Sequence, residues 1–151
     1  MKNLGKTGYA RLVYGELKRK IQMQPEANDS SFENLRAVAK RVQAIKMLGT
    51  LGLANMEMLP HYLVTFEDPY VIVRSVACET AKVLQISSFN SMRCSKNFKL
   101  DDRKCVFKTV LNKLLDLLAK EASLAVRSST LEGFFDVFFI TCLSDSDAEI
   151  D

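Results

Sequence analysis

The sequence predicts an all-α fold, namely an α-solenoid of about three antiparallel helix pairs. Apolar residues recur at three- and four-residue spacing through most of the 151 residues, and runs of alternating Val, Ile and Thr are scarce. Three segments also align on an arginine that is followed by a small residue three positions on and by apolar residues seven and ten positions on. The three arginines are Arg41, Arg74 and Arg127. A repeating helical unit of this kind is typical of solenoids.

The first expected pair covers residues 9–51. Its first helix spans residues 9–23, with apolar residues near one face and basic residues at its C-terminal end. Proline, asparagine, aspartate and serine mark a loop at residues 25–31. The second helix spans residues 32–51. Gly49 and Gly52 lie near its end, and a glycine just past a helix is a common C-cap.

The second expected pair covers residues 55–86. Its first helix is short and contains Pro60, so it begins near that residue or is kinked there. A tight turn at Asp68-Pro69 follows, in which the carboxylate can accept hydrogen bonds from the next amides and the proline suits a first helical turn. The second helix then runs over residues 70–86.

The third expected pair covers residues 101–143 and completes one helical repeat domain over residues 1–143. Residues 87–100 are rich in Ser, Asn, Lys and Arg and are expected to form a loop. The fifth helix starts near Asp101 or Asp102, and the sixth spans residues 124–143. Residues 144–151 are expected to be an acidic flexible tail.

The segment from Met58 to Leu84 resembles a HEAT repeat, a member of the armadillo-like helical class. In that family an aspartate-proline turn ends the first helix, as at Asp68-Pro69, and a valine-arginine pair opens the second, as at Val73-Arg74. Val126-Arg127 resembles the same pair without the proline turn. Residues 41–52 resemble the end of a second helix. Together the resemblance covers most of residues 32–143.

The resemblance implies a right-handed stack in which a turn aspartate and a second-helix arginine link adjacent repeats. Carried onto this sequence, it assigns Asp68 and Arg74 to a structural ladder, with Arg41 and Arg127 as the matching arginines. The third repeat has Glu121 in its turn, which substitutes for the aspartate only approximately. These residues would therefore support the architecture and would not form a reactive site.

The expected function is a non-catalytic protein-protein interaction scaffold, a fragment or short form of a longer HEAT-repeat protein. The partner is not identified by the sequence. The alternative is a nucleic-acid-binding helical module, because the net charge of +3 divides into +6 over residues 1–50, +1 over residues 51–100 and −4 over residues 101–151. A salt-dependent interaction with DNA or RNA would favour that alternative.

We expect no enzyme, cofactor or metal site. The only histidine is His61, and no cysteine lies close to it in the sequence. The longest apolar run, residues 134–143, is shorter than the roughly 20 residues that cross a bilayer. The four cysteines are not spaced as C-x-x-C, and no secretory signal precedes them, so we expect an intracellular location, cytoplasmic or nuclear.

The last expected helix is apolar on more than one side. Phe135, Phe138 and Phe139 lie in a cluster of aromatic residues, whereas a terminal repeat needs a polar outer face to stay soluble. Either packing within the chain covers this excess, or another repeat or a partner does. The sequence therefore indicates an interaction surface on this helix, and self-association of the isolated chain through it.

Overall fold

The computed structural model describes residues 4–23, 32–52, 56–94 and 100–146, which form six α-helices and two short 3-10 helices without any strand. In chain order these elements are α1 (Leu4–Gln22), α2 (Phe32–Leu51), η1 (Met56–Met58), α3 (Leu59–Val64), η2 (Thr65–Glu67), α4 (Val71–Cys94), α5 (Leu100–Lys120) and α6 (Leu124–Ser146). The predicted all-α class is confirmed for this part of the chain.

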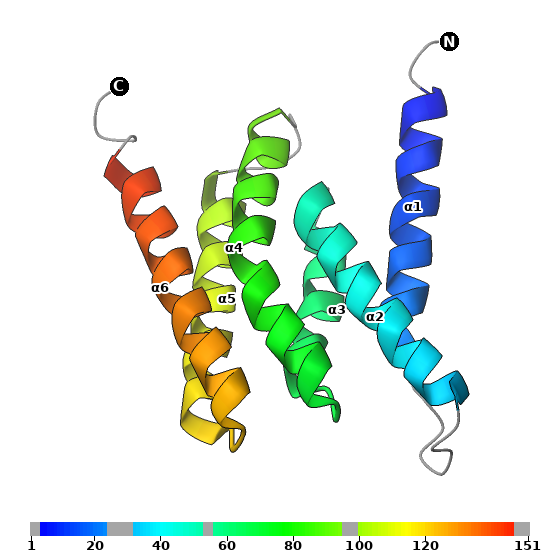
Figure 1. The fold of residues 1–151 in the computed structure, drawn as a ribbon. Coiled ribbons are helices and arrows are strands. Elements are labelled where there is room, and N and C mark those ends of the chain that lie inside the picture. Colours follow the sequence, from blue (N-terminus) through cyan, green and yellow to red (C-terminus); the bar gives the residue numbers. More distant parts are fainter. Residues whose placement is uncertain (1–3, 24–31, 53–55, 95–99, 147–151) are drawn as a thin grey trace.

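The helices form two layers (Figure 1). In one layer α4 lies between α2 and α6, and these three helices run in the same direction. The other layer holds α1, α3 and α5, of which α1 packs on α2 and α5 packs on both α4 and α6. Within each of the pairs α1–α2, α3–α4 and α5–α6 the two helices lie in different layers and run in opposite directions, so the chain crosses from one layer to the other at each turn.

The core lies between the two layers and is built from the apolar faces that the periodicity predicts. The residue three positions after each aligned arginine is fully buried, at Ala44, Ala77 and Thr130. Tyr62 fills the centre, where its hydroxyl donates to the Ala77 carbonyl oxygen at 2.7 Å and its ring meets Phe66 edge-on. Small residues at the repeated position let neighbouring helices approach closely.

Two glycines lie where helices of the same layer approach most closely. A Cβ at Gly49 of α2 would stand 2.4 Å from Thr80 Cγ2 of α4, and a Cβ at Gly133 of α6 would stand 2.8 Å from the Cys78 carbonyl oxygen of α4. Neither contact could accept a methyl group without movement of a helix or a side chain. Glycine is thus required at both helix contacts by space, and not by backbone conformation.

The loop expected at residues 87–100 is wrong for residues 87–94, because α4 continues to Cys94. This segment is polar but holds no proline or glycine, so nothing in it breaks a helix that is already formed. α5 begins at Leu100, and residues 95–99 lie outside the described residues.

Three further boundaries differ from expectation. α1 begins at Leu4 rather than Tyr9, and α6 extends to Ser146, so the first three residues of the expected tail are helical. Around Pro60 the chain forms one short helix between two 3-10 turns, with the proline in the first helical turn. Residues 25–31 and 147–151, expected as a loop and as most of the tail, lie outside the described residues.

Candidate functional site

The first and second helix pairs are joined by a buried ion pair between Arg41 of α2 and Asp68 in the turn before α4. The carboxylate also accepts a hydrogen bond from the Tyr70 amide at 2.9 Å through Oδ1, which caps the start of α4. Burial lowers the pKa of Arg41. Among the described residues, its Nε and Nη1 have no hydrogen-bond partner, so Asp68 is the group that compensates the buried charge.

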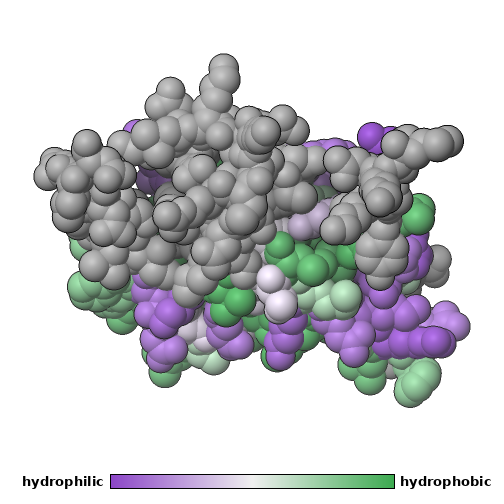
Figure 2. Space-filling view, turned by 90° about the horizontal axis from the view of Figure 1, so that it is seen from above, coloured by the Kyte–Doolittle hydropathy of each residue, from purple (hydrophilic) through white to green (hydrophobic). Residues whose placement is uncertain are grey.

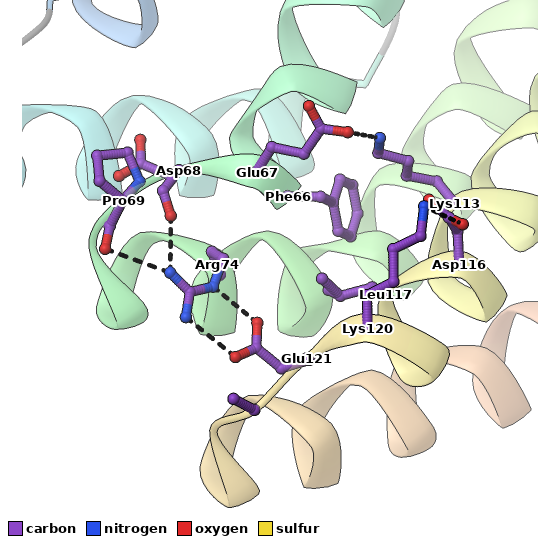
Figure 3. Close-up of a pocket in the computed structure, with 11 residues that line it drawn as sticks. Phe66, Glu67, Asp68, Pro69, Arg74, Lys113, Asp116, Leu117, Lys120 and Glu121 are labelled. Atoms are coloured by element: carbon purple, nitrogen blue, oxygen red, sulfur yellow. Dashed lines mark hydrogen bonds and ion pairs between the residues drawn. The ribbon is translucent and has the colours of Figure 1, made fainter.

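The second and third pairs are joined in the same way by Arg74 of α4 and Glu121 in the turn before α6 (Figure 3). Arg74 Nε donates to Glu121 Oε2 at 2.7 Å, and Nη2 donates to Oε1 at 3.0 Å, which makes the pair bidentate. Arg74 Nη1 donates to the Asp68 carbonyl oxygen at 2.8 Å, so the guanidinium also fixes the turn of its own pair. The hydrogen bonds from Arg74 hold the pKa of Glu121 below its usual range.

The two junctions share one geometry. Glu121 accepts a hydrogen bond from the Ser123 amide at 2.9 Å, just as Asp68 does from the amide two positions further on. Each carboxylate thus caps the second helix of its own pair and bonds the arginine of the preceding pair. Asp68 lies six residues before Arg74, and Glu121 lies six residues before Arg127. This equal spacing identifies Glu121 as the counterpart of Asp68.

An open groove of about 490 Å³ lies at the second junction, between the turn at Asp68 and the end of α5 (Figure 3). Its charged side chains pair with one another rather than converging on an empty position. The pairs are Glu67 with Lys113, Asp116 with Lys120, and Arg74 with Glu121. The groove is therefore the seam between two helix pairs, and two of its ion pairs, Glu67 with Lys113 and Arg74 with Glu121, connect the elements on its two sides.

The third aligned arginine differs from the first two. Arg127 is exposed on α6, and no carboxylate of the described residues forms an ion pair with it. Its helix, α6, is the last of the layer formed by α2, α4 and α6, and the described residues include no further helix beyond it (Figure 1). The structure thus brings Arg41 together with Asp68, and Arg74 together with Glu121, and leaves Arg127 at the surface.

The three phenylalanines that the sequence predicts as an interaction surface lie on an exposed face of α6. Phe135, Phe138 and Phe139 are 50%, 46% and 61% exposed, and Leu131 on the same face is 46% exposed. Their rings form a connected cluster around the half-buried Phe134, with centroid distances of 5.9 to 6.3 Å. Figure 2 shows hydrophobic atoms at the surface on its left edge, the side on which α6 lies in Figure 1.

The opposite side of α6 is buried against α4 and α5: Val126, Thr130, Gly133 and Val137 are buried, and Thr130 and Gly133 contact Cys78 of α4. The helix is consequently apolar on two opposite sides, of which only one is covered. A helix that is apolar on all sides belongs in an interior. We call the face that carries Leu124, Arg127, Leu131, Phe135, Phe138 and Phe139 the outer face of α6.

Some of the basic residues in the N-terminal half form ion pairs within the chain. Arg19 and Lys20 both pair with Glu16, and Arg41 is buried on Asp68. Arg11, Arg36 and Lys46 are exposed.

The histidine and the buried cysteine make separate contacts. His61 contacts Gln22, and Cys78 is a buried free thiol whose pKa burial raises to about 11. In the described residues no three His, Cys, Asp or Glu side chains gather as a metal site. None of the described helices combines the length and the apolar character needed to cross a membrane.

No protein-family model matches this sequence, and no solved structure matches the chain.

Proposed function

We propose that this chain is a HEAT-like α-solenoid segment that acts as a non-catalytic protein-interaction scaffold. Support for the solenoid comes from the repeated junction, in which an arginine of one pair bonds a carboxylate in the turn of the next. Support also comes from the parallel arrangement of α2, α4 and α6, each of which carries one aligned arginine. In this proposal Asp68, Arg41 and Arg74 hold the stack together and take no part in chemistry.

The observation that carries the scaffold function is the outer face of α6. Several large apolar side chains stand exposed there on one helix, which α4 and α5 hold from the other sides. Exposed apolar patches of this kind mark protein-protein contacts, and aromatic residues are enriched where such contacts are strongest. A face held in place by two neighbouring helices needs little ordering when it binds, which favours affinity.

The proposal places the chain in the cytosol or the nucleus. Cys78 is a free thiol in the core and hydrogen-bonds Thr130, so it functions as a small packed side chain. Reduced core cysteines are typical of reducing compartments.

The nucleic-acid alternative has weaker support. Two of the basic side chains on α1 are engaged by Glu16, and Arg41 is buried. Phosphate binding needs several exposed cations on one surface, and these three pairings lower the number of unpaired cations that the N-terminal half can offer, with Arg11, Arg36 and Lys46 still exposed.

Capture from cells with matched variants tests the scaffold function. The tagged chain is compared with a triple variant, Phe135→Ser, Phe138→Ser and Phe139→Ser, and with a control, Leu12→Ser, Phe32→Ser and Leu35→Ser. The control residues are exposed too, but they lie on α1 and α2. We expect the α6 variant to lose its captured proteins and the control to keep them, with unchanged helical circular dichroism in both. Equal capture by all three proteins would refute the proposed function.

A further inference from the structure

The outer face of α6 has direct counterparts inside the molecule. In α4, the residues one, four and eight positions after the aligned arginine face the next helix pair. Their contacts are Ser75 with Ser129 at 3.0 Å, Cys78 with Thr130 at 3.2 Å, and Lys82 with Asp136 at 3.4 Å. These positions therefore define the face by which one pair receives the next.

The same positions in α2 are Val42, Ile45 and Gly49, of which Val42 is half-buried. Ile45 is fully buried, and Gly49 lies against Thr80 of α4. In α6 the equivalent residues are Ser128, Leu131 and Phe135, and all three are exposed. The outer face of α6 thus has the register of a helix-pair junction, with Arg127 in the place that Arg41 and Arg74 occupy at the two covered junctions.

The positive charge of Arg127 on the outer face of α6 specifies the charge of the partner group that would meet it. Arg41 and Arg74 each bond a carboxylate that lies three residues before the first residue of the next second helix, at Asp68 and Glu121. Arg127 occupies the equivalent place on α6, in its first turn. By continuity, the group that meets Arg127 is a carboxylate in the turn of a helix pair.

The large side chains on the outer face of α6 specify the size of the residues that a binding partner would place against them. At the covered junctions the approach is close because one helix supplies a glycine, Gly49 or Gly133. The outer face of α6 has Phe135 at the position equivalent to Gly49, and Leu131 at the position equivalent to Cys78, against which Gly133 packs. The incoming helix therefore has to supply the small residues, as α6 does toward α4 with Gly133. Burial of these two side chains and of Phe138 would provide the apolar part of the binding energy.

A second copy of this chain fits the outer face of α6 poorly. In α6 the residues two, six and nine positions after the arginine face the preceding pair, and in α2 the equivalents are Gln43, Met47 and Thr50. Two of these three are polar and all are exposed. Arg36 and Lys46 on the same helix are exposed as well and have the same charge as Arg127. Head-to-tail stacking would place Gln43, Thr50 and the two basic side chains of α2 on the apolar outer face of α6, alongside the apolar residues Phe32, Leu35 and Met47 that α2 also exposes.

We propose that the outer face of α6 binds an antiparallel helix pair of a different protein. A carboxylate in the turn before the second helix of that pair bonds Arg127, and small residues of that helix pack on Leu131 and Phe135. The inference rests on the proposed scaffold function and goes beyond it by stating the structure and chemistry of the partner.

Site-specific photocrosslinking in cells that produce the protein tests this inference. A photoreactive benzoylphenylalanine replaces Phe135 in the full chain, and in a control protein it replaces Leu12 at the other end. We expect a protein crosslinked from position 135 and absent from position 12, with the crosslinked peptide in a helix next to a turn that contains Asp or Glu. Arg127→Gln should reduce the crosslink and the measured affinity roughly tenfold or more, because it leaves the carboxylate of the partner unpaired.

A charge exchange gives the decisive comparison. With Arg127→Glu binding is lost, and replacing the turn carboxylate of the partner by arginine restores at least part of it. A crosslink that persists unchanged in Arg127→Gln, a crosslinked segment that is not a helix pair, or a crosslink to a second copy of this chain would overturn the inference while leaving the scaffold function standing. Absence of any crosslinked protein at position 135 would count against both.

Discussion

Asp68 and Glu121 are the residues on which the junctions depend. Each accepts one backbone amide of its own turn and one guanidinium from the preceding pair. Asp68 could be identified from the sequence because its turn, with the proline that follows, is a local motif. The pairing of Asp68 with Arg41 and of Glu121 with Arg74 could not be derived from local sequence. The two residues of each pair are 27 and 47 residues apart and meet only through the packing of whole helices.

Removal of the Asp68 carboxylate should strongly destabilise the fold. Asp68→Ala leaves the buried Arg41 without a counter-ion, and a broken buried pair costs about 3–5 kcal/mol. Urea unfolding followed by circular dichroism measures the change. Asp116→Ala removes an exposed pair with Lys120 and is the matched control, with little expected effect. A small loss for Asp68→Ala would mean that the buried pair does not hold the junction.

Glu121 should make stability depend on acid pH. Its folded pKa is lowered, chiefly by Arg74, so its contribution is complete above the unfolded glutamate pKa of about 4.3 and is lost as the pH falls through the lower folded value. We expect Glu121→Gln to be less stable than the wild type at pH 7, and the difference to shrink as the pH is lowered below about 4.3. Unfolding free energies measured across this range would contradict the assignment if the difference stayed constant.

At the scale of elements, the contacts between α2, α4 and α6 depend on glycines at two close approaches. The periodic apolar positions predict these helices. α2, α4, α5 and α6 start within two residues of the expected places, and α1 covers nearly all of the span expected for the first helix. The extension of α4 to Cys94 could not be predicted, because Ser and Asn are weak loop signals and the helix is stabilised by packing more than by propensity. The need for a glycine at position 133 could not be predicted from the sequence either, because it depends on the position of the Cys78 backbone in α4.

Gly133→Ala should separate α6 from α4. The new methyl group would lie 2.8 Å from a backbone oxygen that cannot rotate away, so we expect a loss of about 1–3 kcal/mol, as for other overpacked cores. Gly15→Ala in α1 is the control, because nothing lies within 4 Å of its Cβ position and alanine favours a helix. Thermal melting should therefore shift in opposite directions for the two variants, and a stabilised Gly133→Ala would disprove the close contact.

For the molecule as a whole, the two ends of the layer of second helices differ in chemistry. α2 exposes polar and basic residues such as Gln43 and Lys46 beside the apolar Phe32 and Leu35, whereas the outer face of α6 carries a connected cluster of aromatic rings with Arg127 as its one charged residue. The sequence alone indicated that α6 is apolar on more than one side, but the choice between a covered and an open face required the packing of α4 and α5 around it. That packing leaves Phe135, Phe138 and Phe139 outside.

Without a partner, the purified chain is expected to self-associate weakly through α6. Two outer faces that meet would bury apolar surface but would also bring together two copies of Arg127, so the contact should form only at high concentration. Light scattering should show an apparent mass that rises with concentration in the wild type and stays monomeric in the triple serine variant of Phe135, Phe138 and Phe139. A wild type that remains a monomer at high concentration would contradict this.

The most direct test of the binding role of α6 is radical footprinting of the phenylalanine side chains, in the dilute purified chain and in native extracts of cells that produce it. Phe135, Phe138 and Phe139 are compared with Phe32, which is exposed on α2 and serves as an internal reference. We predict that oxidation of the three α6 rings falls severalfold in the extract while that of Phe32 is unchanged. Equal oxidation of the α6 rings in both samples would contradict the claim that a protein partner covers this face.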